Sequence, residues 1–325
     1  MSAAEWKCVM QRLDTDMTEK YVSAAIYGRS GTGKTSFVVS APSPLICLTE
    51  RQGLVHVKQA AARLNKPIPP VFYCEDLGDL RNLVKAFMGD KSKPFRIRSR
   101  SPDNSASEKI LFELEKWPET IGIDSFTDVC CMVTECLDRE SPPRVGSDGL
   151  PTHTQNYWGA LDTRCSSMIR NIRDLPVNKI FLCLADDKEI GEGAQKTRML
   201  APSLPMRKLA EKLCAAVNVV GYTFRTVKRK QTPEGLKTKL HYGVLTVGPD
   251  YMLTKPYRPL RDAEIPDFSY WLSVIRGDVP ERPAPVAPDD LESGEEAVAA
   301  ATEPPKEESS PPSEPPKAKA KKGVK

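Results

Sequence analysis

The feature that most constrains this chain is a glycine-rich segment near the start of the sequence. Residues 28–35 read GRSGTGKT and fit the pattern G-x-x-x-x-G-K-[ST] in full. The apolar run VSAAIY at 22–27 precedes it, and a short helix is expected over Thr35–Ser40, before Pro42 and Pro44. A buried strand, a glycine-rich turn and a helix in this order predict a loop whose backbone N–H groups surround a phosphate. A chance glycine-rich turn is the alternative, and this context argues against it.

The residue types in this segment suit the phosphates of ATP together with Mg²⁺. Lys34 is expected to neutralise the β- and γ-phosphates, and the Thr35 hydroxyl is expected to ligate Mg²⁺. ATP and Mg²⁺ are therefore the predicted cofactors. The predicted nucleotide-binding residues are Gly28, Ser30, Gly31, Thr32, Gly33, Lys34, Thr35 and Ser36.

A carboxylate beyond this loop is expected to complete the metal site. Asp124 ends the apolar run Thr120–Ile123, and the carboxyl end of a neighbouring strand is where a Mg²⁺ ligand is needed. The alternative role for Asp124 is the N-cap of the next helix, for which Ser125 would serve equally. We predict Thr35 and Asp124 as metal ligands.

A second carboxylate, Glu50, stands just past the apolar run LICL at 45–48. A carboxylate at a strand end can orient the water that attacks the γ-phosphate. A solvated loop acid beside Arg51 is the alternative, and Glu75 is a weaker rival for the same role. The predicted catalytic residues are Lys34, Glu50 and Asp124.

Apolar runs alternate with segments of helical periodicity along most of the chain. This alternation predicts an α/β fold with a mainly parallel sheet flanked by helices, and two late strands add an antiparallel hairpin. The predicted units are an N-terminal arm (1–20), an ATPase domain (21–278) and a disordered tail (279–325) rich in Pro, Glu, Ala and Lys. Expected strands are Val22–Tyr27, Leu45–Leu48, Val71–Tyr73, Thr120–Ile123, Lys179–Ala185, and the hairpin pair Val217–Val227 and Lys239–Val247 around a turn at Gln231–Leu236; expected helices are Thr35–Ser40, Leu54–Leu64, one capped by Asp76, one from Asp124 to about Leu137, Tyr157–Leu175 and Leu204–Ala216.

Three polar stretches, residues 90–108, Arg139–Gln155 and Asp186–Ser203, are expected to be surface loops. Basic residues gather in the first and third and along the hairpin, and Tyr157 and Trp158 follow the second. Single-stranded DNA needs cations for its backbone and aromatic faces for its bases, so each place is a candidate contact, with a solvated face as the commoner alternative. The net charge of +4 does not by itself argue for nucleic acid. The basic residues are Arg96, Arg98 and Arg100 beside Phe95, then Lys188, Lys196 and Arg198, then Arg225, Lys228, Arg229, Lys230, Lys237 and Lys239.

The segments GRSGTGKT, PLICLTERQGL and TIGIDSFTDV, read together, resemble the RecA-like P-loop ATPases of bacteriophages. That group includes single-strand annealing and recombination proteins and AAA-type nucleotide-binding proteins. The resemblance covers about Tyr21–Gly277 and implies a RecA-like fold. It also implies that Glu50 activates water, and that Arg139–Gln155 and Asp186–Ser203 are DNA-binding loops.

The resemblance further implies a homo-oligomer with nucleotide between subunits and a basic residue reaching across, for which Lys228, Arg229 and Arg198 are candidates. The chain departs from the family at the end of the strand Lys179–Ala185. The family often has His or Gln there, whereas this sequence has Asp186, which puts a standard link between DNA binding and hydrolysis in doubt. On the residues alone, Asp186 is a solvated loop acid or, less often, a Mg²⁺ contact.

These features together predict a DNA-dependent ATPase that acts on single-stranded DNA in phage recombination or replication. A single-strand-binding protein or another replication protein is a further candidate partner. A nucleotide-gated regulatory or binding module with little turnover is the first alternative, and a small-molecule kinase is the second. No run approaches the roughly 20 apolar residues of a membrane helix, so we expect no membrane partner. The nine cysteines are scattered and several lie in apolar runs, as reduced thiols do, so we expect a cytoplasmic location, in the host if the chain is phage-encoded.

Overall fold

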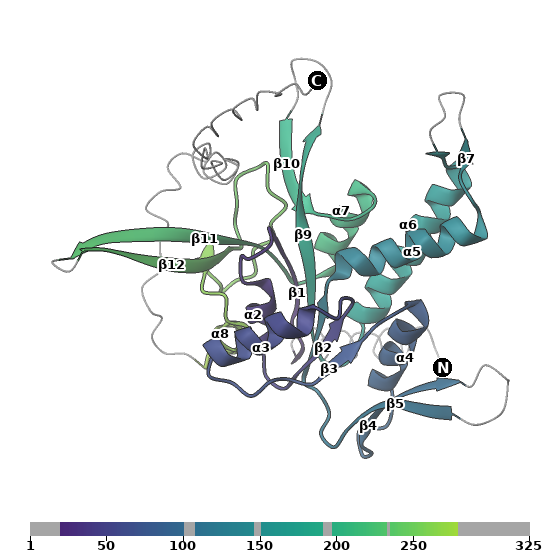
Figure 1. Cartoon of the computed structure of the whole chain (residues 1–325), viewed down its shortest axis with the longest axis horizontal. Coiled ribbons are helices and arrows are strands. Elements are labelled where there is room, and N and C mark those ends of the chain that lie inside the picture. The colour runs from purple at the N-terminus through teal and green to yellow at the C-terminus, as the bar shows by residue number, and fades with distance from the viewer. Residues whose placement is uncertain (1–19, 101–107, 146–150, 191–196, 233–234, 279–325) are drawn as a thin grey trace, which may run out of the picture. The chain divides into compact units, whose positions relative to one another are not determined.

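The computed structural model describes residues 20–100, 108–145, 151–190, 197–232 and 235–278, in which helices pack on both faces of a central sheet (Figure 1). The predicted arm, except Lys20, and the predicted tail therefore lie outside the described residues. The strands are β1 (Ser23–Gly28), β2 (Pro44–Leu48), β3 (Val71–Tyr73), β4 (Phe95–Arg100), β5 (Glu108–Leu114), β6 (Thr120–Asp124), β7 (Arg144–Val145), β8 (Pro151–Thr152), β9 (Asn178–Ile190), β10 (Thr197–Pro202), β11 (Val219–Thr232), β12 (Gly235–Leu245) and β13 (Ala263–Glu264). The helices are α2 (Lys34–Val39), α3 (Gly53–Arg63), α4 (Leu77–Phe87), α5 (Phe126–Glu140), α6 (Gln155–Arg173), α7 (Arg207–Ala216) and α8 (Phe268–Arg276).

The central sheet is mainly parallel, as predicted. Its strand order is β13-β12-β11-β1-β9-β6-β2-β3, with β10 paired to β9. The pairs from β11 through β1, β9, β6 and β2 to β3 are parallel, while β12, β13 and β10 are antiparallel to their neighbours. The α/β fold class and the C-terminal antiparallel hairpin are thus confirmed, and Figure 1 shows that hairpin projecting from the sheet at the left.

The sheet separates two hydrophobic cores, because alternate residues of each strand point to opposite faces. In β1, Ala25 and Tyr27 belong to the core that α4, α5, α6 and α7 cover. Ala24 and Ile26 belong to the core beneath α2, α3 and α8. Burial on both faces explains why the sequence of β1 is a continuous apolar run.

The parallel arrangement brings the carboxyl ends of several strands to one edge of the sheet. β1 ends there at Gly28 and β6 ends there at Asp124, with β9 between the two strands. β2 lies on the other side of β6 and leads to Glu50. Residues that lie far apart in the sequence therefore meet at this edge, where α/β sheets commonly bind ligands.

The predicted surface loop over residues 90–108 is confirmed for residues 90–94, which form an exposed turn, and is wrong for residues 95–100 and 108, which are strand residues. Residues 95–100 form β4, which pairs antiparallel with β5. Phe95 and Ile97 are both fully buried, and Phe95 lies 4.8 Å from Phe87 of α4, ring centre to ring centre. The sequence PFRIRSR alternates apolar and basic residues, which is the period of a half-buried strand and outweighs its polar composition.

The predicted loop over Asp186–Ser203 is also wrong for its described part. β9 continues past Ala185 to Ile190, and β10 pairs with this extension. Asp186 and Asp187 are therefore strand residues, aligned with Ala201 and Leu200. The residues of β9 past Ala185 are held by a ladder of backbone pairing with β10, whose Leu200 is buried in the core, so the polar sequence of this extension did not predict it.

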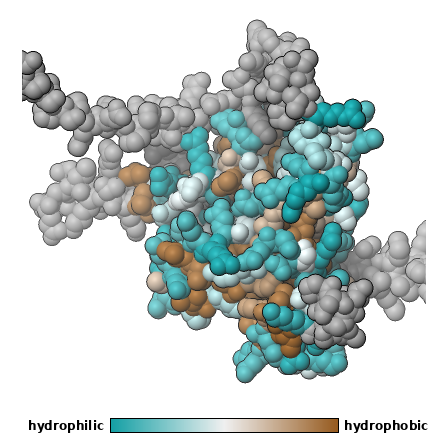
Figure 2. All heavy atoms as spheres, turned by 45° about the vertical axis from the view of Figure 1, so that its right-hand side comes forward, coloured by the Kyte–Doolittle hydropathy of each residue, from teal (hydrophilic) through white to brown (hydrophobic). Residues whose placement is uncertain are grey.

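The surface shown in Figure 2 is largely hydrophilic, with hydrophobic residues gathered in small patches on the lower part of that face. The most exposed large hydrophobic side chain among the described residues is Met88, at 68%. Across the described ranges, none of the helices combines the length and the apolar character needed to span a membrane.

Candidate functional site

The glycine-rich segment forms a tight loop between β1 and α2. Gly31 and Gly33 have φ angles of 75° and 94°, in the left-handed region that glycine adopts without steric cost. Gly33 is the N-cap of α2, and Ser30 and Gly31 are exposed. A loop of this kind can turn successive backbone N–H groups toward one anion.

Strand β11 holds the loop from the side opposite β9. A Cβ atom added to Gly28 would lie 2.1 Å from the Thr223 Oγ1 atom, so only glycine permits this close approach. The hydroxyls of Thr32 and Thr223 form a hydrogen bond of 2.7 Å, and the Thr32 hydroxyl lies 2.7 Å from the Arg29 carbonyl oxygen. Thr223 therefore supports the loop, a role that its sequence context does not reveal.

The hairpin β11–β12 also contacts the tip of the loop. A Cβ atom added to Gly33 would lie 3.4 Å from the Tyr242 ring, and one added to Gly31 would lie 3.8 Å from Arg225. Arg225 and Tyr242 are cross-strand partners in the hairpin. The base of this basic hairpin is thus packed against the glycine-rich loop.

The two residues that begin α2 bind the glycine-rich loop and the end of β6. The Lys34 ammonium donates to the carbonyl oxygens of Gly28 and Arg29, both at 2.8 Å. The Thr35 hydroxyl donates to the Asp124 Oδ2 atom at 2.8 Å. Asp124 and the loop therefore meet, although 89 positions separate Thr35 from Asp124 in the sequence.

The helix cap next to Asp124 is made by Ser125, which leaves the Asp124 carboxylate directed at Thr35. The Ser125 side chain accepts a hydrogen bond from the Asp128 backbone N–H at the start of α5. Of the two roles considered for Asp124, the capping role thus falls to Ser125. The metal role of Asp124 remains a prediction, and its position beside Thr35 is the one that this role requires.

Burial dominates the electrostatics of this pair of charged groups. It raises the pKa of Asp124, while the Thr35 hydrogen bond and the Lys34 charge act in the opposite direction. Burial also lowers the pKa of Lys34, and the nearby Asp124 opposes that change. The ionised side chains of Lys34 and Asp124 both cost free energy when they are buried without a partner. An anion near Lys34 and a cation near Asp124 would therefore each be favoured.

The donor set suits Mg²⁺ held jointly with a nucleotide. Thr35 and Asp124 supply a hydroxyl and a carboxylate oxygen, the hard ligands that Mg²⁺ takes alongside phosphate oxygens and water. No group of three or more His, Cys, Asp or Glu residues gathers as a metal site in the described part of the chain. A divalent ion here would therefore depend on the phosphates for much of its coordination.

Ser36, the last predicted nucleotide-binding residue, is buried in α2, and its Oγ atom accepts a hydrogen bond from the Arg63 guanidinium. Arg63 comes from the end of α3 and also lies over the Tyr242 ring, 5.5 Å from its centre. The sequence reasoning missed both Arg63 and Tyr242. No local motif indicates either residue, because the fold alone brings them to α2.

Glu50 lies at the same edge of the sheet, and its side chain is exposed. It stands two residues after Leu48, which is aligned with Asp124 across the β2–β6 pair. Its rival Glu75 forms an exposed ion pair with Arg51 at 2.5 Å. The catalytic role of Glu50 stays a prediction, whereas Glu75 already has a partner in Arg51.

The aromatic residues singled out as nucleic-acid contacts differ in exposure. Phe95 is fully buried, and Tyr157 is 5% exposed, with its hydroxyl donating to Asp138 and its ring stacked on His153. Trp158 is 40% exposed. Of these three rings, Trp158 therefore remains the best placed to stack on a base.

The predicted DNA-binding segments are only partly described. Within Arg139–Gln155, β7 and β8 pair as a short ribbon, and residues 146–150 lie outside the described ranges. Within Asp186–Ser203, residues 191–196, which include Lys196, lie outside them as well. On the hairpin, Lys228 is aligned with Lys239, and Lys230 with Lys237.

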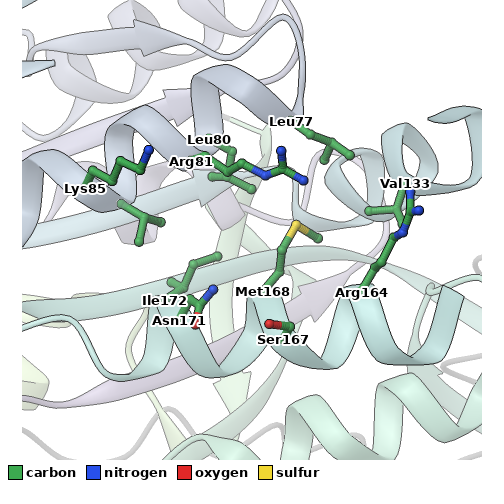
Figure 3. A pocket seen from close by; sticks show the side chains of 11 residues that line it. Leu77, Leu80, Arg81, Lys85, Val133, Arg164, Ser167, Met168, Asn171 and Ile172 are labelled. Atoms are coloured by element: carbon green, nitrogen blue, oxygen red, sulfur yellow. The ribbon is translucent and has the colours of Figure 1, made fainter. Parts of the chain in front are cut away.

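A separate hollow of about 280 Å³ lies between α4 and α6 (Figure 3). Leu77, Leu80 and Met168 line it together with Arg81 and Lys85. None of its lining residues belongs to the glycine-rich loop, and neither Asp124 nor Glu50 is among them. This hollow is therefore not an acceptor pocket beside the phosphate site, as the kinase alternative would require.

Among the comparisons with known proteins, the family match is consistent with a nucleotide-binding domain. No curated protein matches the chain. Among solved structures, it is similar to the flagellar accessory protein FlaH from Methanocaldococcus jannaschii, with 10% identity, a TM-score of 0.31, and coverage of 78% of this chain and 88% of that one. The family model described as AAA domain matches residues 20–246. Because this match spans more than half of the 325 residues, the chain belongs to the AAA domain family.

Proposed function

We propose that this chain binds and hydrolyses ATP with Mg²⁺ and acts as a RecA-like ATPase on single-stranded DNA. The observation that carries the ATPase proposal is the 2.8 Å hydrogen bond between Thr35 and Asp124. It brings the hydroxyl at the start of α2 and a strand-end carboxylate within reach of one cation, directly beside Lys34. Membership in the AAA domain family supports the same nucleotide site.

Each residue at the site then has a chemical task. The backbone N–H groups of residues 29–33 bind phosphate oxygens, and Lys34 exchanges its loop carbonyl partners for the β- and γ-phosphates. Thr35 and Asp124 would hold Mg²⁺, which would supply positive charge to stabilise the phosphates. Glu50 orients the attacking water from the end of β2.

The DNA part of the proposal has a different basis. Lysine positions face one another along the outer part of the β11–β12 hairpin, at Lys228 with Lys239 and at Lys230 with Lys237. A ribbon with this many lysines in its sequence suits a polyanion. The base of the same hairpin contacts the glycine-rich loop through Thr223 and Tyr242, which offers a route from DNA to nucleotide.

An oligomer and a setting in phage recombination or replication are further parts of the proposal. A homo-oligomer would place Lys228, Arg229 or Arg198 near the nucleotide of a neighbouring subunit. The support for this part is the resemblance of the three sequence segments around Lys34, Glu50 and Asp124 to phage RecA-like ATPases. A single-strand-binding protein or another replication protein is the further partner that this setting suggests.

The test is ATP hydrolysis by the purified full chain, with and without single-stranded DNA. We expect Lys34→Ala to lower hydrolysis at least about 100-fold, because it removes the charge that stabilises the transferring phosphate. Lys208→Ala, at an exposed lysine of α7, is the matched control and should hydrolyse ATP like the native chain.

The outcomes separate the two parts of the proposal. Retained turnover in Lys34→Ala would refute the assignment of the nucleotide site. Hydrolysis that is indifferent to DNA would refute the DNA part alone. Bound nucleotide that the native chain does not hydrolyse would favour a nucleotide-gated binding module instead.

A further inference from the structure

A closed ring of hydrogen bonds ties the turn that carries Glu50 to the start of α5. The Thr49 hydroxyl donates to the Asp128 Oδ2 atom at 3.0 Å, and the Ser125 hydroxyl donates to the same oxygen at 2.5 Å. The Ser125 backbone N–H donates to the Thr49 Oγ1 atom at 3.1 Å and closes the ring. Three residues from two separate segments thus share one set of hydrogen bonds.

This ring is more than a helix cap. In an ordinary capping box, the acidic side chain of the first turn would accept from the backbone N–H of the N-cap residue. Here the Ser125 N–H instead donates to Thr49, and the Asp128 carboxylate accepts from the Thr49 hydroxyl. The cap of α5 therefore includes a residue from the end of β2, 79 positions away from Asp128.

The ring also lies beside the predicted catalytic groups. Thr49 immediately precedes Glu50, and its backbone N–H donates to the Asp124 carbonyl oxygen at 3.0 Å. The Thr49 backbone and side chain are both held, whereas the Glu50 side chain is exposed. The orientation of Glu50 relative to Asp124 consequently depends on how firmly Thr49 is held.

We infer that Thr49 and Asp128 are positioning residues. They hold Glu50 where its carboxylate can orient the water that attacks the γ-phosphate. This inference rests on the proposed function, because it needs ATP hydrolysis assisted by Glu50. Asp128 acts here through Thr49 and is not itself a ligand of the metal. Its essential property is one acceptor oxygen, since both bonds in the ring reach Oδ2.

The acceptor requirement separates two kinds of substitution. Thr49→Val and Asp128→Ala each remove a member of the ring. Thr49→Ser keeps the hydroxyl, and Asp128→Asn keeps one side-chain acceptor oxygen while it removes the charge. A role through position predicts loss of turnover in the first pair and retention in the second.

The experiment measures kcat and KM for ATP in these four variants of the full chain, together with thermal unfolding. We expect Thr49→Val and Asp128→Ala to lower kcat by about 10- to 100-fold, the usual effect of a misplaced catalytic group, with KM changed less than about threefold. Thr49→Ser and Asp128→Asn should stay within about threefold of the native kcat. Thr134→Val is the matched control, because it removes a hydroxyl that bonds only within α5.

A second measurement tests whether Thr49 acts through Glu50. Glu50→Gln is combined with Thr49→Val, and the effects on kcat are compared in a double-mutant cycle. If Thr49 only positions Glu50, Thr49→Val should change kcat less than about twofold in the Glu50→Gln background. An undiminished effect in that background would overturn the inference.

The other outcomes are also decisive. A native kcat in Thr49→Val would refute the positioning role. A loss of kcat in Asp128→Asn as large as in Asp128→Ala would refute the inference that Asp128 acts through its acceptor oxygen, because it would show that the charge is needed. Failure of Thr49→Ser to restore kcat would likewise refute it. Absence of hydrolysis in the native chain would instead refute the proposed function, so the two failures are distinguishable.

Discussion

The contact between Gly122 of β6 and Val38 of α2 gives a quantitative test of how the site is held together. A Cβ atom added to Gly122 would lie 2.3 Å from the Val38 Cγ1 atom and 3.1 Å from its Cγ2 atom. Non-bonded carbon atoms normally lie about 3.5–4.0 Å apart. Gly122→Ala must therefore move β6 and α2 apart by on the order of 1 Å.

The expected free-energy change follows from two opposing contributions. Overpacking a buried site typically costs about 1–3 kcal/mol. Replacing glycine by alanine restricts the unfolded chain and returns about 0.4–1 kcal/mol. We therefore expect Gly122→Ala to lower the free energy of unfolding by about 1–2 kcal/mol.

The same displacement should reach the nucleotide site. α2 carries Thr35 and β6 carries Asp124, and their side chains are joined by a hydrogen bond of 2.8 Å. A shift on the order of 1 Å breaks a bond of this length, because hydrogen bonds weaken steeply beyond about 3.2 Å. We expect the affinity for ATP with Mg²⁺ to fall together with stability.

The assay is urea unfolding of Gly122→Ala, Val38→Ala and the double variant, with free energies taken from midpoints and slopes. Val38→Ala removes the two nearest of the three atoms that the new methyl group would meet and leaves only the Val38 Cβ atom, at 3.2 Å. The double variant should therefore be more stable than the sum of the single effects by at least about 1 kcal/mol. Gly159→Ala is the control, because an added Cβ meets nothing within 4 Å there. Its position inside α6 predicts a gain of about 0.5–1 kcal/mol.

Two results would refute this reasoning. One is a Gly122→Ala variant whose free energy of unfolding matches that of the native chain within about 0.3 kcal/mol. The other is strict additivity of the Gly122→Ala and Val38→Ala effects, because two groups that compete for the same space cannot act independently.

Two further predictions follow from buried charges. Because burial raises the pKa of Asp124, stability from this group is present at low pH and is lost as the pH rises through that raised pKa. Asp124→Asn should therefore raise the midpoint of thermal unfolding of the nucleotide-free chain at about pH 8. The same variant should lower the rate of ATP hydrolysis at least about 100-fold. A lowered unfolding midpoint would contradict the argument. Burial lowers the pKa of Lys179 from 10.5 to about 8, so the unfolded chain binds more protons between these values and stability rises with pH there. Lys179→Met should abolish that rise and stabilise the chain at pH 7 by on the order of 2 kcal/mol. This figure is the cost of burying the charge less the lost hydrogen bond to the Leu175 carbonyl oxygen. Urea unfolding at several pH values measures the free energy of unfolding, and an unchanged dependence of that free energy on pH would count against the prediction.

Elements with strong local signals could be predicted from the amino-acid sequence. The pattern of glycines around Lys34 predicted a tight loop between a strand and a helix, and this loop is present, with Gly31 and Gly33 at positive φ. Apolar runs predicted β1, β2, β3 and β6, and Asp76 was correctly predicted to cap α4. These features depend on neighbours within a few residues, so backbone sterics and hydrophobic periodicity are enough to reveal them.

The distant residues that complete the site became known from the folded structure. Thr223 lies 191 positions from Thr32, and Asp128 lies 79 positions from Thr49, yet both pairs are hydrogen-bonded. Such partners depend on strand order and register, which no local pattern encodes. The extension of β9 past Ala185 was missed for the same reason, because its pairing with β10 outweighed a polar local sequence. The strand at Phe95 was missed although PFRIRSR alternates apolar and basic residues, because the polar composition of the segment was given more weight than this period.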